Sequence, residues 1–215
     1  MSTPFLSVDR VSLTVNGEPI LHDVSFSAER GQVIGIIGRN GSGKSMLFKS
    51  IVGLFVPQNG EISVDGFEVV SSRRFPPHLG ALIEKPGFIG SMSAYDNLAL
   101  LASIQRKIGK AEILRSLDAV GLGDAARTRV RKFSLGMKQR LGIAQATMEG
   151  PSLLVLDEPT SGLDADGVEM LRALVLEERE RGTVILIASH LRDDIELLSD
   201  RVFSMDQGRL EPCAT

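Results

Sequence analysis

Eight consecutive residues of the kinds that bind phosphate end at Ser45. They follow the pattern G-x-x-x-x-G-K-[S/T], with Met46 directly after them, and comprise Gly38, Arg39, Asn40, Gly41, Ser42, Gly43, Lys44 and Ser45. The glycines let successive backbone N–H groups point inward as an anion-binding nest, and a following helix adds its positive end. The Lys44 ammonium can reach the β- and γ-phosphates, and the Ser45 hydroxyl can ligate Mg²⁺. The motif therefore predicts a nucleoside triphosphate site rather than a chance glycine-rich turn.

Two acidic residues follow an apolar run later in the chain. Residues 153–156 are apolar, and Asp157 and Glu158 come directly after them. We expect a buried strand to place Asp157 beside the phosphate loop, where it can hold Mg²⁺. Glu158 then lies one residue further out, where it can take a proton from an attacking water. Two acids at a strand end can also begin a solvated loop, but the phosphate loop upstream favours the metal and base roles.

Strands and helices must alternate to bring these residues together. Apolar runs at residues 32–37, 153–156 and 183–188 are typical of strands buried on both faces. Helices are predicted at residues 45–52 and 166–181, and the alternation favours a mostly parallel sheet.

The segments outside this alternation have other patterns. Residues 5–26 alternate apolar and polar positions around an Asn16-Gly17 turn, which predicts an antiparallel layer. Residues 93–148 have mostly helical periodicity. A short helix is predicted at residues 192–198, and the residues after it, 201–211, resemble a hairpin. The chain is therefore predicted to be one α/β unit with a helical insert.

Composition excludes several classes of protein. The 215 residues carry 24 Lys and Arg against 27 Asp and Glu, a net charge of −3, so binding nucleic acid by bulk charge is disfavoured. The single cysteine, Cys213, allows neither an internal disulfide nor a cysteine-based zinc site. No apolar run approaches the ~20 residues of a spanning helix, and no secretory signal is visible. We expect a partner to bring the chain to any membrane at which it works.

Five elements in a fixed order make the sequence resemble the ATP-binding cassette (ABC) ATPases of membrane transporters over essentially its whole length. The phosphate loop and the acid pair are two of them. The third and fourth are the counterparts of the family's signature and dimer loop, formed by Ser134, Leu135, Gly136 and Met137 and by Ser161, Gly162, Leu163 and Asp164. The fifth is the switch histidine, His190, which follows a predicted strand.

The resemblance implies a P-loop NTPase fold with a RecA-like core, an N-terminal antiparallel β layer and an inserted helical subdomain. The core is expected at residues 1–86 and 151–215 and the helical subdomain at about 87–150, all within a single domain over 1–215. ATP and Mg²⁺ are the implied cofactors, with Glu158 as base and His190 in contact with the γ-phosphate.

The resemblance also implies a second subunit. In the family two chains pair head to tail, so that the signature of one closes on the nucleotide of the other, which here implies a homodimer on ATP binding. Ser134, the Gly136 N–H and a helix N-terminus can form the second anion site, although a lone serine there is usually an ordinary N-cap. A separate integral membrane subunit is implied as well, with the chain cytoplasmic at the inner face of the membrane.

Three departures from the family pattern have consequences. Glu84 stands where the family has a glutamine that touches Mg²⁺ and the attacking water, so we expect Glu84 near the metal and the γ-phosphate. Its extra charge is expected to disfavour closure until Mg²⁺ offsets it. Leu135 and Met137 replace glycine and glutamine of the signature. Val15 replaces the aromatic residue that stacks on adenine, so base selectivity is expected to be loose.

A narrower resemblance rests on residues 84–88, Glu-Lys-Pro-Gly-Phe. They are similar to the cassette proteins of lantibiotic self-protection and bacitracin-type export, which implies export of a peptide antibiotic or a similar amphipathic molecule. Phe88, Ile89 and Met92 form either a groove for a partner helix or the core of the helical insert. The six bases between residues 125 and 148, with no acid among them, form either a phosphate- or headgroup-facing surface or a solvated helix face.

Two other functions remain as alternatives. A clamp of the same fold acting on DNA or ribosomes needs a long coiled-coil insert or a second cassette, whereas only about 90 residues separate Lys44 from Ser134 and the chain has one phosphate loop. A small-molecule kinase leaves the signature and His190 unexplained. No nucleic-acid partner is expected.

Overall fold

The first strands form a hairpin because Asn16 and Gly17 both adopt the left-handed conformation of a tight turn, with φ of 51° and 85°. β1 (Leu6–Val15) and β2 (Glu18–Ala28) flank this turn, and β4 (Asn59–Val64) pairs with the other edge of β1. With β5 (Phe67–Glu68) they make an antiparallel sheet of order β2-β1-β4-β5, as the alternation of residues 5–26 predicts. The computed structural model describes residues 3–189, 195 and 197–213.

The central sheet has the order β10-β9-β3-β8-β7-β6. Its strands are β3 (Val33–Ile37), β6 (Leu79–Leu82), β7 (Leu153–Asp157), β8 (Val184–Ser189), β9 (Arg201–Asp206) and β10 (Arg209–Pro212). All neighbouring pairs are parallel except β9 and β10, which form the C-terminal hairpin. The predicted, mostly parallel sheet is confirmed, and the carboxyl ends of β3 and β7 meet at one edge.

Both faces of the central sheet are covered, because successive side chains of a strand point to opposite sides. In β7, Leu153 and Val155 pack with α1 (Lys44–Ile51) and the antiparallel sheet, whereas Leu154 and Leu156 pack with the helices of the other face. All four side chains are completely buried, each worth about 1.5–3 kcal/mol of transfer free energy. The strand that carries Asp157 is therefore held from both sides.

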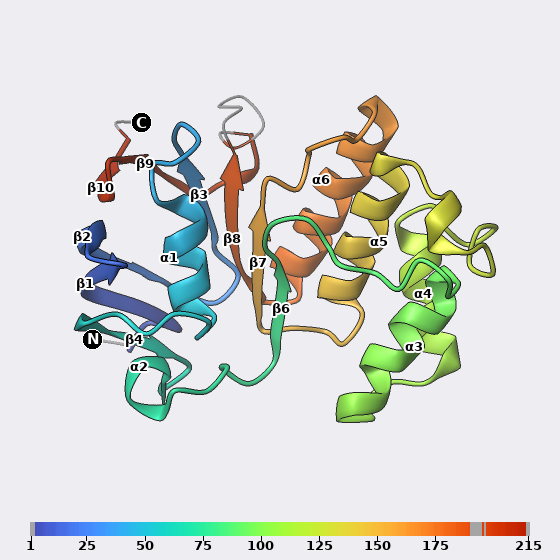
Figure 1. The fold of residues 1–215 in the computed structure, drawn as a ribbon, viewed down its shortest axis with the longest axis horizontal. Coiled ribbons are helices and arrows are strands. Elements are labelled where there is room, and N and C mark those ends of the chain that lie inside the picture. Colours follow the sequence, from blue (N-terminus) through green and yellow to red (C-terminus); the bar gives the residue numbers. More distant parts are fainter. Residues whose placement is uncertain (1–2, 190–194, 196, 214–215) are drawn as a thin grey trace.

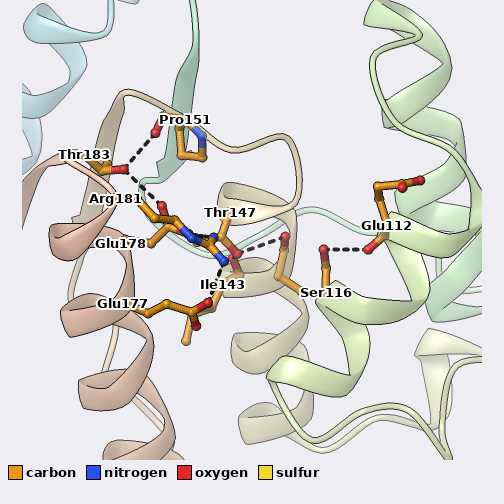
Figure 2. A network of polar contacts seen from close by, with 10 residues as sticks. Glu112, Ser116, Ile143, Thr147, Pro151, Glu177, Glu178, Arg181 and Thr183 are labelled. Carbon is orange, nitrogen blue, oxygen red and sulfur yellow. Dashed lines mark hydrogen bonds and ion pairs between the residues drawn. The ribbon is translucent and has the colours of Figure 1, made fainter.

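The helical region lies on the side of the central sheet where β7 and the edge strand β6 stand (Figure 1). It contains α3 (Ala94–Gln105), α4 (Lys110–Ala119), the 3₁₀ turn η1 (Val130–Lys132) and α5 (Leu135–Thr147), next to α6 (Ala165–Glu180). Ser93 caps α3, because its Oγ accepts a hydrogen bond from the Asp96 N–H at 3.1 Å. α5 approaches β6 so closely that a Cβ on Gly80 would lie 1.9 Å from the Ala146 carbonyl oxygen.

Some elements differ from the sequence-based predictions. α2 (Val69–Ser72), β5 and η1 are too short for a periodic pattern to predict them. The short helix expected at residues 192–198 lies partly outside the described residues. The subdomain limits at about 87 and 150 fall in the β6–α3 connection and just before β7, and they stay a prediction. Within the part of the chain that the structure describes, no helix is long and apolar enough to cross a membrane.

Candidate functional site

The phosphate loop joins the end of β3 to the start of α1. Gly41 and Gly43 have φ of 81° and 113°, a region that glycine adopts without a Cβ clash. The Lys44 ammonium donates hydrogen bonds to the carbonyl oxygens of Gly38 at 2.7 Å and Arg39 at 3.2 Å. The side chain of Lys44 is thus folded across its own loop and buried there. These backbone angles are compatible with the predicted nest, and Lys44 lies across the loop as a phosphate-binding cation would.

A pocket of about 420 Å³ opens over the loop. Asn40, Ser42 and Met46 line it from the loop and α1, and Asp157 and Glu158 line it from the end of β7. The pocket therefore brings together the two motifs that the sequence places more than a hundred positions apart.

Ile20 also lines this pocket, from β2 of the antiparallel sheet. Its place in the pocket is not visible in the sequence, because an apolar residue in an alternating strand carries no signal of a ligand. Val15, expected near the base, is half-buried at the end of β1 and is not among the lining residues.

Asp157 has the oxygen chemistry of a magnesium ligand. Its Oδ2 accepts a hydrogen bond of 2.5 Å from Ser45 Oγ, whereas the buried Oδ1 has no hydrogen-bond partner among the residues that the structure describes. Burial raises the pKa of Asp157, the Ser45 bond opposes this, and the nearby charge of Glu158 adds to the increase. A hydroxyl and a carboxylate with a free buried oxygen fit Mg²⁺, which prefers oxygen ligands. Across the described residues no group of three or more His, Cys, Asp or Glu side chains gathers at one point, so the fit rests on Ser45 and Asp157.

Glu158 stands at the mouth of the same pocket. Its backbone is left-handed, with φ of 49°, and its N–H donates to the Ala188 carbonyl at 2.8 Å. Its Oε1 lies 3.7 Å from Lys44 Nζ, and its Oε2 accepts a hydrogen bond of 3.4 Å from Ser189 Oγ. The carboxylate is thus held beside the ammonium of Lys44, and its expected role as the base stays a prediction.

Glu84 lies two residues after β6, with φ of 61° and a side chain that is 62% exposed. Its carboxylate forms an ion pair with Lys49 on α1 rather than joining Ser45 and Asp157. It is still near enough that its charge contributes to raising the pKa of Asp157, after the larger effect of burial. The expected contact of Glu84 with the metal stays a prediction.

The signature residues begin α5. Ser134 is the N-cap, and its exposed Oγ accepts a hydrogen bond of 3.1 Å from the Met137 N–H. A second pocket, of about 580 Å³, is lined by both predicted motifs: Ser134, Leu135, Gly136 and Met137 of the signature and Gly162 and Asp164 of the dimer loop. It shares no lining residue with the phosphate pocket. One chain therefore presents two separate surfaces, as a head-to-tail arrangement requires.

Gln139 and Arg140, which follow the signature on α5, connect this helix to the acid pair and the dimer loop. The Gln139 amide, itself buried, donates to the carbonyl oxygens of Glu158 at 3.2 Å and Pro159 at 3.0 Å. Arg140 forms an ion pair of 2.6 Å with Asp164, which also caps α6 through the Gly167 N–H. The Arg140 hydrogen bond and the Gly167 N–H lower the pKa of Asp164. No sequence pattern assigned these bonds, because they join positions about 20 residues apart.

The remaining candidate residues are scattered. His190 lies outside the described residues. Phe88 is partly buried against the helical core, whereas Ile89 is 47% exposed in the same loop. Four of the six bases of residues 125–148 are exposed and form no ion pair among the described residues: Arg127, Arg129, Arg131 and Lys132. The expected partner groove stays a prediction.

Comparison with known sequences agrees with the geometry. The family described as ABC transporter matches residues 21–161. An uncharacterized ABC transporter ATP-binding protein of Bacillus subtilis (strain 168), YybJ, is 41% identical, over 89% of this chain and 88% of its own length. The lantibiotic transport ATP-binding protein SrtF of Streptococcus pyogenes is 37% identical, over 95% of this chain and 88% of its own. The bacitracin transport ATP-binding protein BcrA of Bacillus licheniformis is 36% identical, over 98% of this chain and 69% of its own.

Solved structures have the same fold. An ATP-binding subunit of an ABC transporter superposes with a TM-score of 0.87 at 28% identity, covering 98% of this chain and 90% of that one. The dimeric structure of the bacterial ABC transporter cassette MJ0796 superposes with a TM-score of 0.86 at 21% identity, covering 98% and 99%. At 21% identity, the similarity to MJ0796 shows only that the two chains share a fold.

Proposed function

This chain belongs to the ATP-binding proteins of ABC transporters, and from that premise we propose how its residues bind and hydrolyse ATP and what the transporter carries. As a member of the family the chain is an ATPase subunit that uses ATP and Mg²⁺. The alternative of a clamp acting on nucleic acid or ribosomes is not supported, because the relatives described above are transporter subunits.

The proposed roles follow the phosphate pocket. The backbone N–H groups of residues 38–45 and the Lys44 ammonium bind the phosphates, and Ser45 and Asp157 hold Mg²⁺. A bound Mg²⁺ supplies neutralisation of charge on the phosphate oxygens. Glu158 takes the proton of the attacking water, and His190 and Glu84 are proposed to contact the γ-phosphate end of the site. The observation that supports this best is the buried, unpartnered Oδ1 of Asp157 beside Ser45 and Lys44.

We propose that the second pocket completes the site of another copy. Ser134, Gly136 and the N-terminus of α5 present donors in a pocket that shares no lining residue with the phosphate pocket, which supports a role toward the nucleotide of another copy. A two-fold pair places each signature on the partner's nucleotide, with residues 161–164 at the seam. The division of the chain into a helical subdomain at about 87–150 and a core at 1–86 and 151–215 is part of this proposal.

The membrane partner is proposed to dock beside the loop that carries Glu84. Ile89 is exposed there, and the cations of residues 127–132 form no ion pair within the described part of the chain; both support a contact with an integral membrane subunit that holds this chain at the cytoplasmic face. Co-purification of the chain with the membrane proteins encoded by its neighbouring genes tests this proposal. Retention of the chain on nucleic acid instead would contradict it.

The cargo is proposed to be a peptide antibiotic or a similar amphipathic molecule, moved outward. The names of SrtF and BcrA and the Glu-Lys-Pro-Gly-Phe segment support this. The test is co-expression of the chain and its membrane partner in a sensitive bacterium, followed by growth in bacitracin or a lantibiotic. Raised tolerance that is lost with Glu158→Gln supports export, and tolerance equal to that of the Glu158→Gln strain contradicts it.

A further inference from the structure

The ion pair of Glu84 joins it to a residue that no motif includes. Lys49 lies on α1, five positions after Lys44, so the two ammonium groups belong to one helix that begins at the phosphate loop. A rise of about 1.5 Å per residue separates their Cα atoms by roughly 7–8 Å along the axis. Lys49 thus stands between the phosphate site and the loop that follows β6.

Lys49 is held in place more firmly than a surface lysine. Its side chain is only 18% exposed, and its ammonium lies 5.9 Å from the centre of the Phe55 ring as well as against the Glu84 carboxylate. Its backbone carbonyl accepts hydrogen bonds from the N–H groups of Leu54 at 2.8 Å and Phe55 at 3.2 Å. The turn after α1 therefore fixes both the lysine and the ring against which it rests.

The charges around the site explain why such a lysine is needed. After the larger effect of burial, the charges of Glu158 and Glu84 add to the raised pKa of Asp157, whereas the charge of Lys44, which lies 3.7 Å from Glu158 Oε1, opposes it. A glutamine at position 84 would add no charge, but a glutamate adds one near the place where ATP brings its own negative phosphates. Lys49 is the cation that contacts this additional carboxylate.

We propose that Lys49 is a positioning residue that holds Glu84 against α1 before nucleotide binds and releases its carboxylate toward the metal when Mg²⁺ and ATP arrive. This inference rests on the proposed function of the phosphate pocket. The exchange breaks one ion pair and forms a metal contact, and no covalent bond changes. Lys49 would then determine how strongly Mg²⁺ enhances ATP binding.

The test is a double-mutant cycle on nucleotide affinity in the whole chain. Binding of a non-hydrolysable ATP analogue is measured with EDTA and with saturating Mg²⁺, and the ratio of the two dissociation constants is the metal enhancement. Lys49→Gln leaves the Glu84 charge uncompensated, so we expect affinity in EDTA to fall and the metal enhancement to rise, each by roughly 1.5- to 5-fold, as for a partly exposed ion pair.

The other variants separate positioning from a general charge effect. Glu84→Gln should lower the metal enhancement, and adding Lys49→Gln to it should change the enhancement no further. Lys49→Arg, which keeps the ion pair, should restore the wild-type ratio. Arg30→Gln, which breaks an exposed ion pair with Asp65 on the antiparallel sheet, should leave the ratio unchanged.

An equal effect of Lys49→Gln with and without Glu84 would overturn the proposal, because the lysine would then act on the phosphates directly or on folding alone. Thermal unfolding of each variant checks the fold, and Lys49→Met, which keeps an unbranched side chain without the charge, replaces the glutamine variant if that one unfolds. A wild-type chain that binds no ATP even with Mg²⁺ would instead refute the proposed function, so the two failures are distinguishable.

Discussion

Replacing Glu158 by glutamine is the sharpest test of the proposed chemistry. The substitution keeps the size of the side chain and leaves the backbone bond to the Ala188 carbonyl untouched. It removes the one feature that a general base needs, a carboxylate that can accept a proton. It also removes a negative charge 3.7 Å from the Lys44 ammonium, and with it a carboxylate that competes with phosphate for this ammonium.

The size of the effect follows from the role. Losing a general base lowers turnover by roughly 10²- to 10⁴-fold, which corresponds to about 2.7–5.4 kcal/mol of transition-state free energy. Binding of ATP should be unchanged or tighter, because a carboxylate beside the phosphate pocket repels the nucleotide. Binding without turnover should make the ATP-bound dimer accumulate.

Two measurements on the purified variant are required. Release of inorganic phosphate gives turnover, and light scattering with Mg²⁺ and ATP gives the mass of the complex. Glu61→Gln, an exposed substitution on β4, is the matched control and should behave like the wild type. Turnover of Glu158→Gln close to that of the wild type would refute the assignment of the base.

Three other perturbations test separate parts of the structure. Ser134→Arg fills the second pocket, which the signature lines, and leaves the phosphate pocket intact, so ATP should still bind. Light scattering should nevertheless show only monomer, and an ATP-dependent dimer would contradict pairing through the signature. Gly80→Ala puts a methyl group 1.9 Å from the Ala146 carbonyl and should cost about 1–3 kcal/mol of unfolding free energy, seen in urea denaturation; an unchanged midpoint would show that α5 can move away. Chelation by EDTA should abolish phosphate release, because Asp157 Oδ1 then lacks a cation, and undiminished release would exclude the metal role of Ser45 and Asp157.

The central sheet could be predicted from sequence because its signals are local. A strand buried on both faces is apolar at every position, as in residues 153–156, and a phosphate loop needs its glycines and lysine within eight positions. Such patterns can be recognised without knowing which elements pack against the segment. For the same reason the hairpin at Asn16-Gly17 was predictable, since the turn is set by its own backbone angles.

What depends on packing could not be predicted. Ile20 reaches the phosphate pocket only because the antiparallel sheet packs on α1. The partner of Glu84 is a lysine 35 positions away, and an isolated lysine on a helix reads as solvated surface. The sequence around Gly80 does not indicate that a side chain is excluded there, because only the approach of α5 shows why it would not fit. These features are contacts between elements, which periodicity along one segment does not encode.

The Gln139 amide gives α5 a second structural role in the proposed dimer, in addition to presenting the signature. In the proposed dimer, the first turn of this helix faces the partner's nucleotide, while about one turn later Gln139 binds the main chain at Glu158, the proposed base. A shift of α5 when the partner binds nucleotide would then be transmitted to the main chain at Glu158 and Pro159 through these two hydrogen bonds. On this proposal, the two nucleotide sites of a pair are coupled within each subunit, and we expect hydrolysis at one site to depend on the state of the other.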